Sequence, residues 1–269
     1  MSALSNPSAS KESTLLAGIK QSPFLPVRRL ETEWLDEPGH SRETLAGNFR
    51  DIAFLNRWFG GLSPVDKSLR PFLSVERPVA FTILDLAAGG ADVPLALARR
   101  WRKQGIKLAI TALDIDPAIT ELAMEAAHRE NLEEFRAITA DVFTYPYPED
   151  REYDFVTCSL AFHHFSPELC VEMLRLMSNL AGRAFVVNDL RRGWFGWFGS
   201  KLLTLLVARH PFTRHDGPLS VLRSYTIKEM EALVRAAQLD PTWKVRVRRG
   251  PFSRLVIVGE NQEALNKGA

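Results

Sequence analysis

The chain has 269 residues, of which 46% are hydrophobic, and its formal net charge is +2. This length and composition fit a globular protein with one sizeable core. The mild charge argues against a nucleic-acid partner, which would require a concentrated basic face. With two cysteines, a disulfide scaffold is excluded, and a cytoplasmic location is the expectation. We find no signal-peptide pattern and no run of 18 apolar residues that would predict a membrane span.

Four segments are predicted along the chain. Residues 1–25 are rich in Ser, Lys and Pro and are expected to form a loose tail. Residues 26–78 are expected to form a helical cap and linker, because apolar side chains recur at helical spacing within 42–60. Residues 79–260 alternate strand and helix patterns, and 261–269 are a polar tail. The sequence therefore predicts one main α/β domain.

Within 79–260 the predicted strands and helices follow one another regularly. Helix starts are predicted at Asp92, Asp116, Ser166 and Thr226, the last with Glu229 in a capping box. Such repeats form a mostly parallel sheet with helices on both faces, and ligands bind beyond the carboxyl ends of its strands. Two final strands flank a turn at 249–251 and predict an antiparallel hairpin. The predicted strands, seven in all, are 79–86, 108–113, 136–140, 153–160, 184–187, 243–248 and 253–258.

A small-residue loop follows the first predicted strand. Gly89 and Gly90 carry no Cβ, so the backbone can approach a ligand closely there. The dinucleotide pattern G-x-G-x-x-G fails, because Ala87 occupies its first glycine position. Asp85 would also repel a pyrophosphate, whereas it is compatible with the ammonium group of S-adenosylmethionine (SAM). The loop therefore favours SAM over a dinucleotide.

Carboxylates also follow the second and third predicted strands. Asp114 can accept hydrogen bonds from both ribose hydroxyls of an adenosine, and a charge-assisted bond contributes roughly 1.5–3 kcal/mol. Asp116 is expected to cap the next helix. Asp141 can accept from an adenine amino group while Val142 packs on the ring. Together these positions predict an adenosine site along one edge of the sheet.

The strand ends resemble those of the class I SAM-dependent methyltransferases, in the order ILDLAAGGADVP, ITALDID, ITADVF and YDFVTCSLAFHHF. The resemblance is to the small-molecule branch that includes quinone-biosynthesis enzymes, and it covers about residues 79–260. It implies a Rossmann-like fold with SAM as cofactor. Family members usually have glycine where Ala87 stands. Upstream, DIAFLN is similar to a lid motif that ends in asparagine. The resemblance implies these cofactor-binding residues: Asn56, Asp85, Ala87, Gly89, Gly90, Asp114, Ile115, Asp141, Val142 and Ser159.

The residues after the fourth strand bear on the methyl acceptor. The motif (N/D)PP(Y/F), typical of enzymes acting on DNA adenine or glutamine amides, is absent there. No carboxylate ends the fourth strand, so no metal site is expected, although Asn188 and Asp189 follow the fifth. His163 and His164 could supply a general base, or could simply pack on neighbouring phenylalanines. His215 is the rival candidate.

The segment 191–223 is rich in large apolar side chains. It fits an ordinary packed helix, a hydrophobic lid over a lipophilic acceptor, or an interfacial helix at 194–208 in peripheral contact with a membrane. Arg191, Arg214 and Arg223 are candidate acceptor-binding residues. The cations that alternate along 244–248 are expected to be the solvent face of an edge strand.

These patterns predict a SAM-dependent methyltransferase whose partner is a small lipophilic acceptor, an aromatic hydroxyl or quinone-type compound, with O-methylation favoured. Carbon or nitrogen methylation of another small molecule is the alternative. A SAM-binding protein without methyl transfer is an alternative of another class. An RNA methyltransferase is disfavoured by the modest charge.

Overall fold

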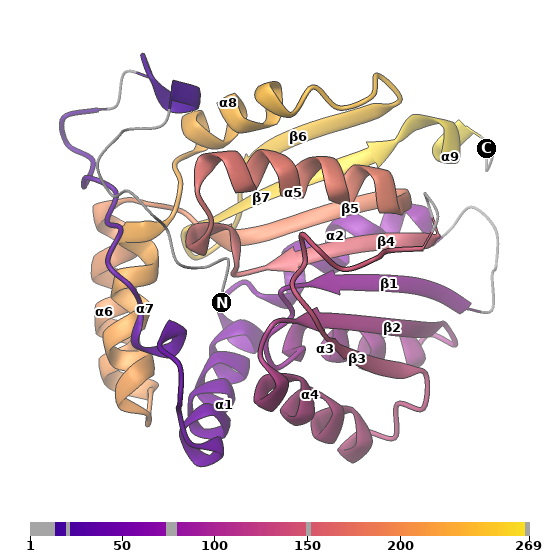
Figure 1. Ribbon diagram of the computed structural model, residues 1–269, viewed down its shortest axis with the longest axis horizontal. Helices are drawn as coiled ribbons and strands as arrows, with labels where there is room; N and C mark the ends of the chain where they lie inside the picture. Colours follow the sequence, from indigo (N-terminus) through magenta and orange to yellow (C-terminus); the bar gives the residue numbers. More distant parts are fainter. Residues whose placement is uncertain (1–13, 20–21, 74–79, 149–151, 267–269) are drawn as a thin grey trace.

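The computed structural model describes residues 14–19, 22–73, 80–148 and 152–266, and it contains a seven-stranded sheet in the order β3-β2-β1-β4-β5-β7-β6 (Figure 1). Neighbouring strands are parallel from β3 to β5, and β7 is antiparallel to both β5 and β6. The predicted α/β fold with a C-terminal antiparallel hairpin is confirmed. The strands are β1 Ala80–Leu86, β2 Lys107–Asp114, β3 Phe135–Thr139, β4 Tyr153–Ser159, β5 Ala181–Leu190, β6 Trp243–Arg249 and β7 Arg254–Asn261.

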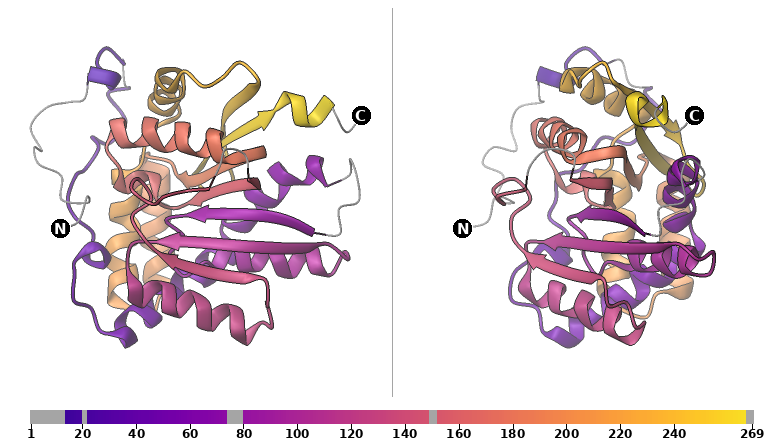
Figure 2. Two further views of the ribbon diagram at one scale, coloured as in Figure 1. Left: turned by 45° about the vertical axis from the view of Figure 1, so that its right-hand side comes forward. Right: turned by 90° about the vertical axis from the view of Figure 1, so that its right-hand side faces the viewer.

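Alternate side chains of each central strand enter two different hydrophobic cores. Leu84 and Leu86 of β1 pack on one face, against α5 Pro167–Leu180 and α8 Ile227–Ala237. Phe81 and Ile83 pack on the other, against α2 Leu62–Leu69, α3 Asp92–Arg102 and α4 Pro117–Arg129. Figure 2 shows the helices on both sides of the sheet. β6 is an edge strand, and Lys244, Arg246 and Arg248 are exposed on it as predicted.

Helix starts follow the predicted capping residues with one exception. The Asp116 carboxylate accepts from the N–H of Ala118, and Thr226 and Glu229 form a complete capping box. The prediction that Asp92 caps a helix is wrong: Ala91 occupies the cap position in a left-handed conformation, with φ of 53°, and Asp92 is the first helical residue. The tight turn after β1 shifts the helix start by one residue and leaves the Asp92 carboxyl group free to face the site.

The carboxyl edge of the sheet is covered by elements from distant parts of the chain (Figure 1). These are α1 Arg42–Trp58, the pair α6 Trp194–Val207 and α7 Pro211–Arg223, and a segment at residues 28–40, called the strap below, which contains the 3₁₀ turn η2 Trp34–Asp36. The apolar insert 191–223 is therefore a helical pair, α6 and α7, beside the strand ends.

Both predicted tails contain short helical elements. The 3₁₀ turn η1 Thr14–Leu16 lies within the predicted tail 1–25 and contacts α5 and α8. α9 Gln262–Asn266 lies within the predicted tail 261–269. Predictions for residues 1–13, 20–21, 74–79, 149–151 and 267–269 lie outside the described residues. Among the described helices, none is both long and apolar enough to cross a membrane.

Candidate functional site

A cavity of about 940 Å³ lies at the carboxyl edge of the sheet. One part is lined by the loops that follow β1, β2, β3 and β4, and another by α1, α6 and the strap. The SAM-binding residues predicted from the sequence are all at its wall, namely Asn56, Asp85, Ala87, Gly89, Gly90, Asp114, Ile115, Asp141, Val142 and Ser159. The fold thus gathers residues spread over about a hundred positions into one cavity.

The loop after β1 turns tightly and is fastened to β2. Ala87 and Gly89 both have positive φ, 51° and 52°, a region that favours glycine. The Gly89 N–H donates to Oδ2 of Asp114 at 2.7 Å. A Cβ on Gly89 or Gly90 would come within 3.0 or 3.2 Å of the Phe49 ring in α1. Small residues are therefore required there because α1 lies directly on the loop.

Three carboxyl groups are close together at the start of this loop. Asp85 is buried and accepts a hydrogen bond from the Thr157 hydroxyl at 2.5 Å. Burial raises the pKa of Asp85 to about 7, and the charges of Asp92 and Asp114 add to the effect. Burial also raises the pKa values of Asp92 and Asp114. An accumulation of buried acids without enough cations favours a positively charged ligand group in the cavity.

Asn56 and Arg254 complete this end of the cavity. Nη2 of Arg254 donates to Oδ1 of Asn56 at 2.9 Å, and Nδ2 of Asn56 lies 3.4 Å from Oδ1 of Asp92. Arg254 is buried, and its desolvation lowers its pKa to about 10. The sequence analysis missed Arg254, which lies in the C-terminal hairpin. Its proximity to α1 cannot be inferred from any local pattern.

The residues predicted for the adenosine are arranged along the neighbouring strand ends. Oδ1 of Asp141 accepts from the Phe143 N–H at 2.9 Å, and the buried Val142 side chain also faces the cavity. Ile115 is 40% exposed at the wall. The Ser159 hydroxyl is buried and has no hydrogen-bond partner, so a polar ligand group in the cavity would satisfy it.

His163 and His164 lie in the 3₁₀ turn η4 Phe162–His164, which follows β4, and both line the cavity. Nδ1 of His163 is 2.7 Å from Oδ1 of Asp189, and its backbone N–H donates to Oδ2 of the same residue at 2.8 Å. Burial alone would raise the pKa of Asp189, but the interaction with His163 and these hydrogen bonds hold that pKa below its usual value. Asp189 therefore fixes the orientation of the His163 ring and leaves Nε2 directed away from β5.

The strap supplies two acids to the same cluster. Nε2 of His163 is 3.5 Å from Oε1 of Glu33, and Nδ1 of His164 is 3.0 Å from Oδ2 of Asp36. Burial opposes protonation of His164, but Glu33 and Asp36 raise its pKa to about 9. His164 is therefore charged at neutral pH. Sequence reasoning missed Glu33 and Asp36, because they were assigned to a cap and linker far from the histidines.

The other residues predicted to bind the acceptor lie outside the cavity lining, and Arg223 is the one that contacts the histidine cluster. Nη1 of Arg223 is 3.0 Å from Oδ2 of Asp36 and 3.7 Å from Oε1 of Glu33. Arg223 therefore belongs to the cluster, although it does not line the cavity. His215 is stacked on Trp34, with ring centroids 3.9 Å apart, and Arg214 donates to the Ala208 carbonyl. None of the predicted residues Arg191, Arg214, His215 and Arg223 is among the residues that line the cavity.

Glu33, His163 and His164 also present ligand-type atoms within 4.8 Å of one another. A metal ion would need both imidazoles neutral. Here His164 is held protonated, and the Arg223 guanidinium lies against Glu33. Two positive charges, on His164 and Arg223, therefore already lie against the acids of the cluster, an arrangement that suits acid–base chemistry better than metal binding.

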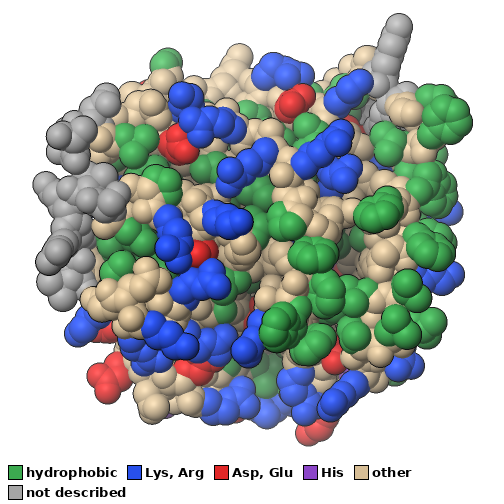
Figure 3. Space-filling model, turned by 180° about the vertical axis from the view of Figure 1, so that it is seen from behind, with side chains coloured by type: hydrophobic (Ala, Val, Ile, Leu, Met, Phe, Trp, Pro, Cys, Tyr) green, Lys and Arg blue, Asp and Glu red, His purple; other side chains and the backbone are tan. Residues whose placement is uncertain are grey.

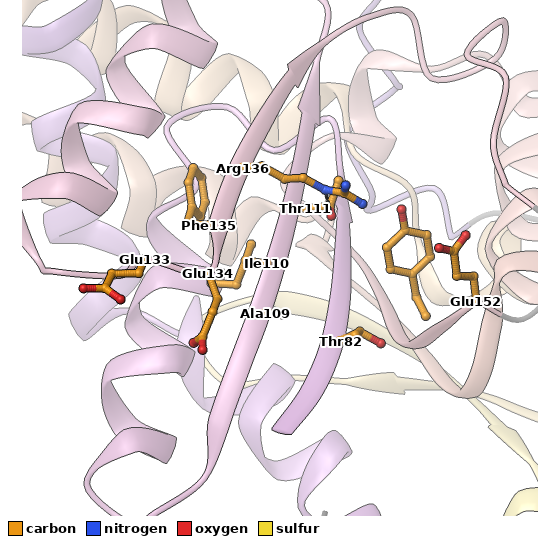
Figure 4. A pocket seen from close by; sticks show the side chains of 10 residues that line it. Thr82, Ala109, Ile110, Thr111, Glu133, Glu134, Phe135, Arg136 and Glu152 are labelled. Atoms are coloured by element: carbon orange, nitrogen blue, oxygen red, sulfur yellow. Dashed lines mark hydrogen bonds between the residues drawn. The ribbon is translucent and has the colours of Figure 1, made fainter. Parts of the chain in front are cut away.

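A second hollow, of about 300 Å³, lies against the sheet near the amino ends of β3 and β4 (Figure 4). Arg136 donates there to the Thr111 hydroxyl at 2.8 Å, and Glu133, Glu134 and Glu152 stand around it. It contains none of the loops that follow the strands, so it is not where this fold binds its ligand.

The comparisons with known proteins agree with this geometry. Residues 83–181 match the family model described as a methyltransferase domain. A comparison with curated proteins gave no match.

Solved structures of low identity share the fold. A SAM-dependent methyltransferase from Aquifex aeolicus has a TM-score of 0.55 and 16% identity over 83% of this chain and 100% of its own. The plantazolicin methyltransferase BpumL, in complex with SAH, has a TM-score of 0.59 and 14% identity over 85% of this chain and 92% of its own. An O-methyltransferase family 2 protein from Planctomyces limnophilus, in complex with apigenin, has a TM-score of 0.57 and 13% identity over 84% of this chain and 63% of its own. The family match over β1 to α5, together with this fold and its strand-end cavity, shows that the chain contains a SAM-dependent methyltransferase domain of class I.

Proposed function

We propose that the protein transfers the methyl group of SAM to a hydroxyl oxygen of a small lipophilic acceptor, an aromatic hydroxyl or quinol-type compound. The observation that carries this proposal is the continuity of one cavity. It runs from the glycine loop and strand-end acids to an apolar wall, with a buried histidine–carboxylate cluster on the way.

The strand-end part of the cavity fits SAM. Asp85 and its neighbouring acids favour the ammonium group, and Asp114 and Asp141 offer acceptors for the ribose and adenine. The unpartnered Ser159 hydroxyl also faces this part. SAM supplies a methyl group on a positively charged sulfur, which is ready for displacement by a nucleophile. The chain's contribution is to hold donor and acceptor in line and to exclude water.

The remaining wall fits an apolar acceptor. Ile52 and Leu55 of α1 and Leu202, Leu203 and Leu206 of α6 line it. Binding sites of this kind orient their ligands with a few polar groups on an otherwise apolar wall. The O-methyltransferase that shares the fold was solved with apigenin, which supports an aromatic hydroxyl acceptor.

His163 is the residue best placed to take the acceptor proton. A phenol with a pKa near 10 is only about one part in a thousand ionised at pH 7, so a base is needed. Asp189 orients His163 through Nδ1, as the acid of a catalytic dyad does. The charged His164 stands beside it, with ring centroids 4.1 Å apart, and favours the oxyanion that forms.

Substitution of His163 tests the proposal. In His163→Gln we expect kcat on alkylated phenols and hydroquinones to fall at least about a hundredfold, as loss of a general base does, while calorimetry shows unchanged SAM affinity. His128→Gln, on the exposed side of α4, is the matched control and should keep full activity. Full activity of His163→Gln would refute the assignment of the base. Turnover of polar amines or RNA alone would refute the acceptor class.

The same cluster leads us to infer that methyl transfer needs no metal ion. Because the charged His164 and Arg223 already lie against its acids, we expect activity to be unchanged by EDTA. Loss of activity in EDTA that is restored by a divalent cation would overturn this inference.

A further inference from the structure

Large apolar side chains are exposed around α6 to an unusual degree. Within α6, Thr204 is the one buried residue. Phe195 is 87% exposed and Leu206 71%. Neighbouring parts of α1 and of the turn between β6 and β7 add to the same surface. We call this surface the apolar rim; it consists of Phe54, Trp58, Trp194, Phe195, Phe198, Leu202, Leu205, Leu206 and Phe252. Figure 3 shows hydrophobic side chains gathered on this side of the molecule, with Lys and Arg around them.

The apolar rim is continuous with the mouth of the cavity. Phe195, Leu202, Leu206 and Phe252 are exposed to solvent and at the same time line the cavity wall. The cavity that contains the histidine cluster is therefore open toward the apolar rim, which gives a lipophilic molecule a route inward along apolar side chains. Groups of large, exposed apolar side chains on a domain surface mark a contact surface.

The charges at the margin of the rim are positive. The stretch 191–215 contains no Asp or Glu, and Lys201, Arg209 and Arg214 are exposed in it, whereas Arg192 is buried in an ion pair with Glu229. Arg57 lies over the Trp58 ring at 5.5 Å, and Lys201 over the Trp197 ring at 5.1 Å. Arg209, just beyond α6, is exposed. Such side chains cover apolar surface with their stems and leave their charged ends free, as they do at a membrane interface.

We propose that the apolar rim docks on an anionic membrane surface and that the acceptor enters the cavity from the bilayer; the second part rests on the proposed function. Charge complementarity favours lipid over a second copy of the chain, because two basic margins facing each other would repel. With 14 residues, α6 is about 21 Å long, too short to span a bilayer. It therefore lies in the plane of the headgroups, with one side on the lipid and the other on the cavity.

Vesicle flotation tests this docking. Vesicles of phosphatidylcholine and phosphatidylglycerol in equal parts should bind the protein, and binding should weaken with salt. Phe198→Ser with Leu205→Ser removes two outward side chains that do not line the cavity, and should weaken binding at least about tenfold. Val27→Ser, 82% exposed just before the strap, is the matched apolar control. Lys201→Glu should weaken binding, whereas Lys244→Glu, on the edge strand β6, should not.

SAM affinity measured on the same preparations separates this proposal from the proposed function. A chain that binds SAM but does not float with anionic vesicles would overturn the docking alone. Equal flotation of the double serine variant and the wild type would also overturn it. Sedimentation that shows a dimer in the wild type and a monomer in the double serine variant would also overturn the docking, because the rim would then be an interface between copies of the chain.

Discussion

The carboxyl group of Asp85 is buried near those of Asp92 and Asp114, and its pKa is raised to about 7. A raised carboxyl pKa means that the SAM-free protein loses stability as the pH rises from about 4 to about 7, and keeps that stability at lower pH. An ammonium group in the cavity reverses the balance, because it favours the charged carboxylate. SAM binding below pH 7 must therefore release a proton from Asp85.

This coupling predicts a pH-dependent affinity. Between about pH 5.5 and pH 7.5, SAM affinity should rise with pH, by up to about tenfold per pH unit below the pKa. Calorimetry in buffers of different ionisation enthalpy would measure both the affinity and the proton released. Asp85→Asn should bind SAM more weakly and with a flat pH profile. A variant whose profile runs parallel to that of the wild type would contradict the role of Asp85.

Asp114 combines two tasks in one side chain. It anchors the glycine loop through the Gly89 N–H at 2.7 Å, and its place at the end of β2 suits the ribose hydroxyls. Asp114→Ala should weaken SAM binding about tenfold or more, since each 1.4 kcal/mol corresponds to a factor of ten. Glu134→Ala, at an exposed position before β3, is the control and should bind normally. An unchanged SAM affinity in a folded Asp114→Ala protein would refute the assignment.

At the scale of elements, the strap is held in place mainly by charged groups. The Asp216 carboxylate in α7 accepts from the backbone N–H groups of Trp34 and Leu35, at 3.0 Å each. On the same side, Ser220 donates to Glu33 at 2.8 Å. The position of the strap acids beside His163 and His164 therefore depends on α7, an element nearly two hundred residues away along the chain.

Removing this anchor should loosen the strap. In Asp216→Ala, amide hydrogen exchange at residues 33–37 should become at least about tenfold faster, because two hydrogen bonds to a charged group are lost at roughly 1.5–3 kcal/mol each. Acceptor turnover should fall while SAM affinity is retained. Glu172→Ala, exposed on α5, is the control. Unaltered exchange at 33–37 in Asp216→Ala would show that other contacts hold the strap.

The same dependence explains what could and could not be predicted from the sequence. Strand ends and helix caps are local signals, so the sheet and the residues after β1 to β4 were predictable. Ala91 was not recognised as a cap, because its left-handed backbone is imposed by the turn and not by its side chain. Glu33, Asp36 and Arg254 escaped prediction because their partners are distant in sequence and carry no motif.

At the scale of the whole molecule, the cavity connects three functional regions. The strand ends present the groups expected to hold SAM, the strap and η4 present the acid–base cluster, and α1 and α6 present the apolar wall. Each region comes from a different part of the chain. The central claim is that a methyl group passes from the first region to an acceptor held by the other two.

The most direct test is to incubate the protein with deuteromethyl-SAM and a lipid extract, then analyse the organic phase by mass spectrometry. We predict a labelled, lipophilic O-methyl ether that is reduced with Asp114→Ala at limiting SAM and much reduced with His163→Gln. A label found only in polar amines or RNA, or no label despite measured SAM binding, would contradict the account.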